Sequence, residues 1–223
     1  MKKLACLHAH HSNIPYIEDL LKPFPIEISH HVDPGLMDQI KNNPHFDLQL
    51  AQTKVNSQIA WLEDTHPDAI LITCTNYIAL MDTERKFPSI PLIKIDEPFF
   101  EKICSITAPQ IVIFTNQDTV EGTLARLNDY AKSNMKNINI EVRMLPEAFS
   151  LIMKGLKSEH DAMLAAFMDE LIQKEKKVIS VAQLSMVDAA RQMSAKHALT
   201  ILNPLDALTK TIVDALDLPI NAE

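Results

Sequence analysis

Short apolar runs alternate with longer helix-forming segments along the 223-residue chain, and this alternation limits the fold more than any other feature. Strands that alternate with helices form βαβ units and a mainly parallel sheet. The strands expected are residues 3–8, 26–29, 69–73, 91–95, 110–115, 138–144, 177–182 and 198–202. The helices expected are residues 15–21, 34–42, 48–64, 76–86, 98–106, 119–135, 146–155, 159–175, 185–196 and 204–216. The sequence therefore predicts an α/β protein.

The two halves of the chain repeat one pattern, in which an apolar strand leads into a polar cluster before a helix. Cys74-Thr75-Asn76 follows the strand in the first half, and Gln183-Leu184-Ser185 follows it in the second. Residues 7–13 and 113–119 form a second matching pair. This repetition predicts two similar α/β lobes, related by a pseudo-twofold axis, that face each other across a cleft. We expect residues 1–96 and 205–223 in the first lobe and residues 97–204 in the second, because the helix after Asn203-Pro204 can return to the first.

Cys74 stands at the end of the apolar run 69–73, where a buried parallel strand would feed a helix. That position places one thiol at the carboxyl edge of the sheet, beside the free N–H groups of a helix start. Those donors favour the thiolate, the reactive form of cysteine, and open α/β sheets bind their ligands at this edge. The alternative is that Cys74 is a small buried hydrophobe, which is the usual fate of a free cysteine.

Composition excludes several classes of function. The chain has only three glycines, so it contains neither a GxGxxG fingerprint nor a phosphate-binding P-loop, and we expect no nucleotide cofactor. A net charge of −8 argues against nucleic acid or an anionic membrane as partner. The three cysteines are scattered, which argues against a disulfide framework or a zinc knuckle. With no recognisable signal peptide or membrane-spanning run, we expect a cytoplasmic protein.

Three short motifs resemble those of the aspartate/glutamate/hydantoin racemase superfamily. Thr73-Cys74-Thr75-Asn76 resembles the motif of its first catalytic cysteine, and residues 114–119 resemble the Ala-Thr-x-x-Thr segment that opens its second lobe. Residues 181–186 fall where the superfamily has its second cysteine, in a Leu-Gly-Cys-Thr/Ala pattern. The resemblance extends over nearly the whole chain.

The resemblance implies a homodimeric enzyme without cofactor or metal, whose lobes close over a small carboxylic acid or amino acid. In that superfamily two cysteines on opposite faces of the substrate remove and return its α-proton. A thiol suits both roles, because its pKa of about 8.5 lies near neutral pH. By position, Thr75, Asn76, Thr115 and Thr119 would bind the substrate carboxylate. Helix capping competes with this role: Thr75 or Asn76 could be an N-cap, and Thr119 could cap the helix that follows it.

The chain departs from the superfamily at Gln183, which occupies the position of the second cysteine. A glutamine does not titrate, so the two-base route is unsupported, and neither Cys6 nor Cys104 is placed to substitute. Three outcomes follow. Cys74 could add to an activated double bond, as in maleate isomerases; it could protonate one face of the substrate, as in related decarboxylases; or the protein could bind a small acid without turnover. We favour a one-cysteine enzyme in which Gln183 hydrogen-bonds the substrate.

The histidines support a rival hypothesis. His8, His10 and His11 end the first expected strand, and an HxH pair at a strand end is a metal-binding arrangement in hydrolases. A metal-dependent hydrolase is therefore one alternative, and a non-catalytic binding protein for small acids is another. If instead His10 or His11 lines the cleft, either could contact the substrate and activate Cys74. Surface or capping positions for these histidines remain a third interpretation.

Overall fold

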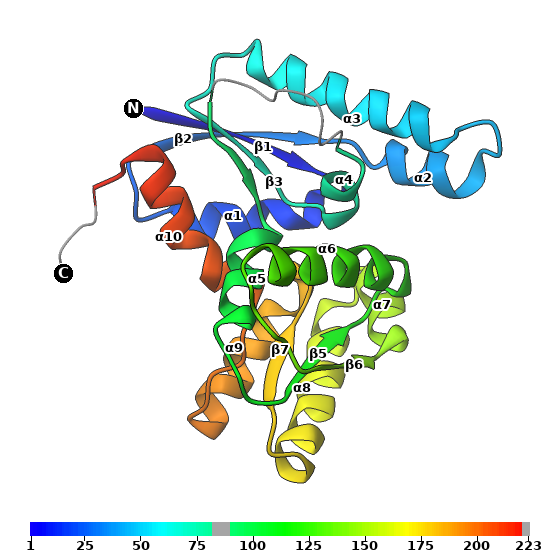
Figure 1. Cartoon of the computed structure of the whole chain (residues 1–223), viewed down its shortest axis with the longest axis vertical. Coiled ribbons are helices and arrows are strands. Elements are labelled where there is room, and N and C mark those ends of the chain that lie inside the picture. The colour runs from blue at the N-terminus through cyan, green and yellow to red at the C-terminus, as the bar shows by residue number, and fades with distance from the viewer. Residues whose placement is uncertain (82–89, 220–223) are drawn as a thin grey trace. The chain divides into compact units, whose positions relative to one another are not determined.

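The structure is a computed structural model that describes residues 1–81 and 90–219. It confirms the α/β class, with two parallel sheets flanked by helices (Figure 1). The chain divides into two compact units, one formed by Met1–Asp96 with Leu208–Glu223 and the other by Glu97–Ala207. None of the described helices combines the length and hydropathy that a membrane crossing requires.

Unit 1 contains a four-stranded parallel sheet in the order β2-β1-β3-β4. Its strands are β1 (Lys2–His8), β2 (Ile26–Val32), β3 (Ala69–Ile72) and β4 (Leu92–Lys94). Its helices are α1 (Ile14–Leu21), α2 (Gly35–Asn42), α3 (Leu48–Glu63) and α4 (Thr75–Ala79), together with most of α10 (Pro204–Leu216). Helices α1 and α3 lie on opposite faces of the sheet (Figure 1).

The covered faces explain the sequence of β3, whose four residues are all buried and apolar. A central parallel strand that is covered on both sides needs no polar alternation. Helix α3 supplies one cover, because Ala51, Val55, Ile59 and Leu62 recur at helical spacing and are buried. Its start is fixed by Asp47, whose side chain accepts a hydrogen bond from the N–H of Leu50 at 2.9 Å.

Unit 2 contains a three-stranded parallel sheet in the order β6-β5-β7. Its strands are β5 (Gln110–Phe114), β6 (Ile140–Met144) and β7 (Val178–Val181). Its helices are α5 (Asp96–Cys104), which begins at the boundary, α6 (Val120–Ser133), α7 (Pro146–Met153), α8 (Lys157–Lys174) and α9 (Val187–His197).

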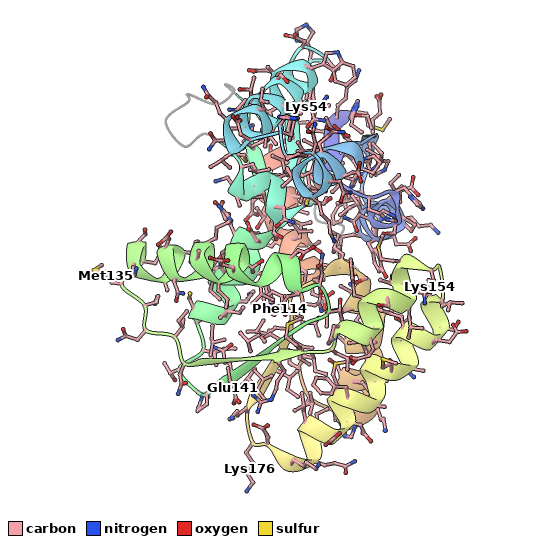
Figure 2. All side chains as sticks on the ribbon, turned by 90° about the vertical axis from the view of Figure 1, so that its right-hand side faces the viewer. Lys54, Phe114, Met135, Glu141, Lys154 and Lys176 are labelled. Atoms are coloured by element: carbon pink, nitrogen blue, oxygen red, sulfur yellow. The ribbon has the colours of Figure 1, made fainter. Side chains whose placement is uncertain are left out.

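Strand β5 joins two hydrophobic clusters, because its successive side chains point to opposite faces. Ile111 and Ile113 belong to the cluster formed with α7, α8 and α9, whereas Val112 and Phe114 belong to the cluster formed with α5 and α6. Figure 2 shows Phe114 in the interior of this unit and Met135 at its periphery, in agreement with their exposed fractions of 0% and 92%. The wholly apolar stretch of β5 therefore reflects a sheet with helices on both faces.

Two expected elements differ from the structure. Residues 198–202 do not form a strand: Ala198 adopts a left-handed conformation that ends α9, and only Leu202 makes a bridge, to Ser180. A residue with φ of 50° cannot begin an extended strand, so the alternation of apolar residues misled the prediction there. The helix expected over 76–86 is shorter in the structure, where α4 ends at Ala79, and residues 82–89 lie outside the described part of the chain.

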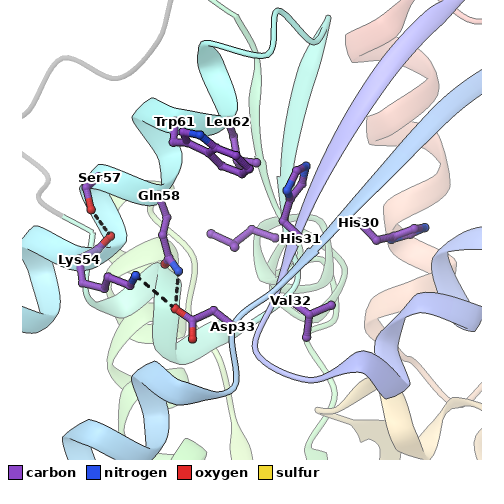
Figure 3. A pocket seen from close by; sticks show the side chains of 10 residues that line it. His30, His31, Val32, Asp33, Lys54, Ser57, Gln58, Trp61 and Leu62 are labelled. Atoms are coloured by element: carbon purple, nitrogen blue, oxygen red, sulfur yellow. Dashed lines mark hydrogen bonds and ion pairs between the residues drawn. The ribbon is translucent and has the colours of Figure 1, made fainter.

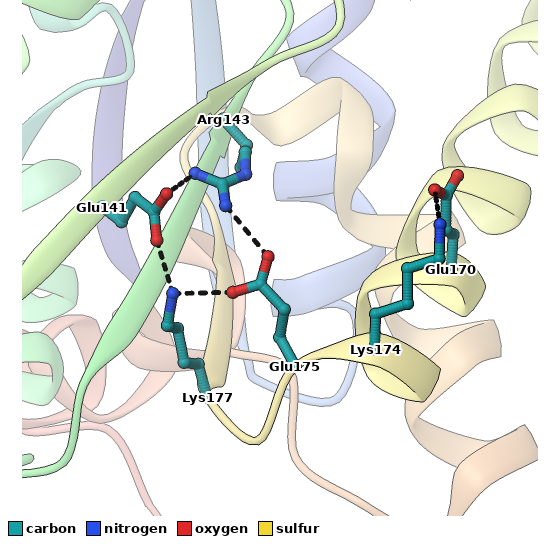
Figure 4. A network of polar contacts seen from close by, with 6 residues as sticks. All are labelled: Glu141, Arg143, Glu170, Lys174, Glu175 and Lys177. Atoms are coloured by element: carbon teal, nitrogen blue, oxygen red, sulfur yellow. Dashed lines mark hydrogen bonds and ion pairs between the residues drawn. The ribbon is translucent and has the colours of Figure 1, made fainter.

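Four charged side chains close a ring near the beginning of β7 (Figure 4). Glu141 and Arg143 of β6 pair with each other, and Arg143 also contacts Glu175 at 2.9 Å. Lys177 completes the ring with contacts of 2.5 Å to Glu141 and 2.6 Å to Glu175. Because each charge has two opposite neighbours, the ring ties β6 to the segment that enters β7.

Candidate active site

Each sheet has a topological switch point, where successive connections leave in opposite directions. In unit 1 it lies between β1 and β3, because β2 is added on one side of β1 and β3 on the other. In unit 2 it lies between β5 and β7 for the same reason. Open α/β sheets bind their ligands outside the carboxyl ends of the strands at such points. The residues that follow β1, β3, β5 and β7 are therefore the candidates for a site.

Cys74 lies at the unit 1 switch point, directly after β3 and Thr73, as the N-cap residue of α4. Its side chain is half-buried, whereas Cys6 and Cys104 are buried. Burial raises the pKa of the Cys74 thiol, and the Asp96 carboxylate acts in the same direction. The backbone N–H groups of Tyr77 and Asn76 lower that pKa, but they do not outweigh burial. The start of α4 therefore supplies N–H donors to the thiol, as expected. The expectation that they favour the thiolate of Cys74 was wrong, because burial has the larger effect on its pKa.

Thr75 and Asn76 form the first turn of α4 and are half-buried. The expectation that one of them is the N-cap was wrong, because Cys74 occupies that position and makes no side-chain capping bond. Both side chains therefore stand beside the thiol without a capping role.

Three side chains in contact, Thr73, His8 and His30, connect the residue that follows β3 to β1 and β2. His8 is 0% exposed, and its Nδ1 lies 2.8 Å from Thr73 Oγ1. Its Nε2 lies 2.9 Å from His30 Nδ1. The strand register explains the meeting: Leu7 pairs with Ile72, which sets His8 beside Thr73, and Cys6 pairs with His30. We call these three residues the histidine chain.

Thr73 Oγ1 stands at one end of the histidine chain. It accepts a hydrogen bond from Asn13 Nδ2 at 3.3 Å, lies 2.8 Å from His8 Nδ1 and donates to the Leu7 carbonyl at 3.3 Å. The tautomer of His8 sets which group is the donor in its contacts with Thr73 and His30. At the other end of the chain, His30 Nε2 lies 3.7 Å from a carboxylate oxygen of Glu18, which is too long for a hydrogen bond.

Burial keeps the histidine chain neutral. It lowers the pKa of His8 to about 4, with further contributions from His30 and His31. Burial likewise lowers the pKa of His30, although Glu18 opposes that effect. A neutral imidazole donates a hydrogen bond from one nitrogen and accepts one at the other, which matches the two ring contacts of His8.

His10 and His11 occupy the turn that follows β1. His10 is the N-cap of the 3-10 helix His11–Asn13, and its Nδ1 lies 3.2 Å from the N–H of Ser12, from which it accepts a hydrogen bond. The rings of His10 and His11 lie 4.3 Å apart. Burial lowers the pKa of His10, followed by the effect of His11. Asn116 occupies the matching N-cap in unit 2, before the 3-10 helix Gln117–Thr119, so the turn is repeated.

The structure does not gather the histidines of the hydrolase hypothesis into one ligand set. Within residues 1–81 and 90–219, the group of potential metal ligands is Cys6, His8 and His30, whose donor atoms lie within 4.8 Å of one another. His8 and His30 already share a hydrogen-bonded proton, which a metal ion would have to displace. We therefore interpret this cluster as part of the histidine chain.

Gln183 lies at the unit 2 switch point, two residues after β7. Its Oε1 accepts hydrogen bonds from the backbone N–H and the hydroxyl of Thr115, at 2.8 and 2.7 Å. A third bond comes from the N–H of Asn116 at 3.2 Å. We call these donors the three-donor cluster. Thr115 and Gln183, which the sequence assigned separately to the substrate, thus contact each other directly.

Thr119 stands at the N-cap position of α6 but makes no capping bond. Its hydroxyl instead donates to the carbonyl of Asn116 at 2.8 Å. Thr119 is therefore the N-cap residue, as the capping alternative proposed, but its side chain does not cap the helix.

A pocket of about 560 Å³ lies in unit 1, away from the predicted residues (Figure 3). Strand β2, its following residue Asp33, and helix α3 supply most of its lining. The rings of His31 and Trp61 meet edge to face with centroids 5.2 Å apart. Asp33 accepts a hydrogen bond of 2.5 Å from Gln58 and pairs with Lys54 at 3.8 Å. None of the predicted site residues lines this pocket.

The sequence indicated which residues lie at the strand ends, but it did not indicate their hydrogen-bond partners. It noted His8 at a strand end but did not pair it with His30, and it did not assign a role to Thr73 or Asn116. The only signal for these contacts was that each residue ends or follows a strand of the same sheet. The register that joins them is visible only in the structure.

Comparisons with solved structures place the fold among racemases. The aspartate racemase of Picrophilus torridus aligns with a TM-score of 0.72 at 10% identity, over 98% of this chain and 96% of that one. The glutamate racemase of Francisella tularensis in complex with D-glutamate aligns with a TM-score of 0.68 at 14% identity, over 97% and 81%. The allantoin racemase of Klebsiella pneumoniae aligns with a TM-score of 0.64 at 16% identity, over 97% and 89%.

No protein-family model matches the sequence, and no curated sequence matches it significantly. The likeness therefore lies in the structure rather than in sequence identity. The chain has the same fold as these aspartate, glutamate and allantoin racemases.

Proposed function

We propose that the protein is a cofactor-independent enzyme of the racemase and isomerase type, which acts on a small carboxylic acid or amino acid. One observation carries the proposal: the half-buried thiol of Cys74 stands at the switch point with two backbone N–H groups directed at it. Similar structures include racemases of aspartate and glutamate, and one of them was solved with D-glutamate. Their fold supports an amino acid or a related carboxylic acid as the substrate.

In this proposal Cys74 is the acid and base, or the nucleophile. Its raised pKa means that the thiol is protonated near neutral pH, so it is suited to deliver a proton to the substrate. To remove an α-proton, the thiol must first lose its own proton to solvent. Thr75 and Asn76 contribute polar contacts beside the thiol, and His10 and His11 contribute them from the turn after β1. In unit 2, Thr119 and Gln183 are the residues proposed to contact the substrate, and Thr115 acts through its hydrogen bonds to Gln183. Gln183 cannot exchange a proton, so chemistry at the α-carbon proceeds through one face of the substrate.

Deuterium exchange tests the proposal. The full chain is incubated in D₂O with each enantiomer of aspartate and glutamate, and label at the α-carbon is followed by NMR and mass spectrometry. We expect label to enter with the original configuration retained, because a single thiol removes and returns the proton on one face. Chiral chromatography measures the configuration.

Cys74→Ala should abolish exchange, whereas Cys104→Ala serves as the matched control because that thiol is buried in α5. Equal exchange by wild type and Cys74→Ala would remove Cys74 from the chemistry. Tight binding of an amino acid without label would instead favour a binding protein for small acids. The raised pKa of Cys74 and the non-titrating Gln183 are the observations that favour this second candidate.

A further inference from the structure

The side chain of Gln183 is held in one orientation. Its Oε1 receives all three bonds of the three-donor cluster, at 2.7 to 3.2 Å. Two of those donors are backbone N–H groups, which cannot accept a hydrogen bond. If the amide were flipped, its NH₂ group would face two N–H groups, which would leave buried donors unpaired at a cost of about 1–3 kcal/mol each. The chemistry of the neighbours therefore fixes which end of the amide is oxygen.

The fixed oxygen determines what the free end of Gln183 offers. Its Nε2 carries two N–H groups, and none of the residues in the described part of the chain accepts a hydrogen bond from it. The side chain is only half-buried, so this end remains available to a ligand. Gln183 follows β7 at the switch point, where ligands of open α/β sheets bind.

The same bonds change the role of Thr115. Its backbone N–H and its hydroxyl both donate to Gln183, and the residue is 1% exposed. A hydroxyl has one proton to donate, so Thr115 has no donor left for a carboxylate. Its effect on a ligand must therefore pass through Gln183.

We propose that Gln183 is a fixed hydrogen-bond donor that recognises a carboxylate or carbonyl oxygen of the ligand, and that Thr115 is the residue that positions it. The inference rests on the proposed function for the choice of a small acid as ligand. It assigns unit 2 a recognition role, in which an acceptor on the ligand is selected and no proton is transferred.

The decisive variant is Gln183→Glu. One carboxylate oxygen of the glutamate can accept the same three donors, so the fold is preserved, but the second oxygen presents an acceptor where the amide presented donors. Gln117→Glu is the matched control, because it adds the same charge at an exposed position two residues beyond Thr115. Thr115→Val removes one donor of the cluster, and Thr115→Ser restores it.

The probes are malonate, succinate and both enantiomers of aspartate and glutamate, titrated into ¹⁵N-labelled full-length protein. We expect a carboxylate to shift the side-chain NH₂ resonance of Gln183. We also expect Gln183→Glu to weaken its binding at least about tenfold and Thr115→Val to weaken it severalfold, with recovery in Thr115→Ser. Gln117→Glu should bind within about twofold of wild type.

The inference is overturned if no carboxylate in the panel binds wild type, if saturation leaves the Gln183 resonance unmoved, or if Gln183→Glu binds as tightly as wild type. These outcomes are separable from those of the deuterium experiment. If a carboxylate binds through Gln183 but no deuterium enters the α-carbon, the inference is supported and the proposed enzymatic activity is rejected. If wild type and Gln183→Glu incorporate deuterium equally, the enzymatic activity is supported and the role of Gln183 is rejected.

Discussion

Replacement of His8 by glutamine should reduce the loss of stability that unit 1 suffers in acid. His8 is 0% exposed, and burial lowers its pKa from 6.5 to about 4. Between these two pH values the unfolded chain binds a proton at this position and the folded chain does not. The free energy of unfolding therefore falls as the pH drops from about 6.5 to 4, and His8 contributes nothing further to the decline below that range.

The magnitude follows from the two pKa values. Each tenfold change in proton affinity corresponds to about 1.4 kcal/mol, so protonation of His8 should cost the fold about 3 kcal/mol by pH 4. His8→Gln lacks this cost. At neutral pH the variant should be less stable than wild type by about 1–2 kcal/mol, because its shorter amide cannot reach both Thr73 Oγ1 and His30 Nδ1. The difference between the two proteins should therefore shrink on acidification and disappear before pH 4.

Urea unfolding at several pH values between 7 and 4 measures this difference. His45→Gln is the control, because it removes an exposed histidine from the loop before α3. A gap between wild type and His8→Gln that stays constant across the range would refute the reasoning. It would mean that the pKa of His8 is not lowered in the folded protein.

Three further predictions concern other parts of the chain. Iodoacetamide should alkylate Cys74 before the two buried thiols, and the rate of Cys74 alkylation should keep rising above pH 8.5 because burial raises the pKa of this thiol. Peptide mapping measures the order, and faster labelling of Cys6 or Cys104 would contradict the prediction. Tyr77→Phe should lower the free energy of unfolding by about 1–2 kcal/mol in urea titrations, because the buried hydroxyl donates to the Asp33 carbonyl at 2.5 Å. Lys177→Met should lower the melting temperature of unit 2 by calorimetry, and the difference should narrow in 1 M NaCl; an unchanged difference would show that the charged ring contributes no Coulombic stabilisation.

Strands β3 and β5 could be predicted from the sequence because each combines short length with an apolar run. β3 and β5 are covered on both faces, and this burial produces the runs that marked them. The same signal failed over residues 198–202, where the apolar residues serve the end of a helix and a single bridge. Hydrophobic pattern reports burial, and it does not report whether the backbone is extended.

The sequence indicated where the candidate residues lie in the fold, but it did not indicate their contacts. The rule that ligands meet strand ends sufficed to single out Cys74 and Gln183. It could not indicate that Gln183 receives three hydrogen bonds, since that depends on the register of β5 against β7. Nor could it indicate that burial outweighs two N–H groups at Cys74, because the balance depends on what packs around the thiol.

The course of the chain through the two units has a consequence for its synthesis. Glu97–Ala207 is continuous, so every residue of unit 2 has been made while the second part of unit 1, which begins at Leu208, is still to be translated. Ile212 and Leu216 of α10 are buried, so the apolar surface they cover stays open until α10 has been translated. A nascent chain that stalls near residue 207 should therefore carry one finished domain and one unfinished domain, and the unfinished domain is the one a chaperone would bind.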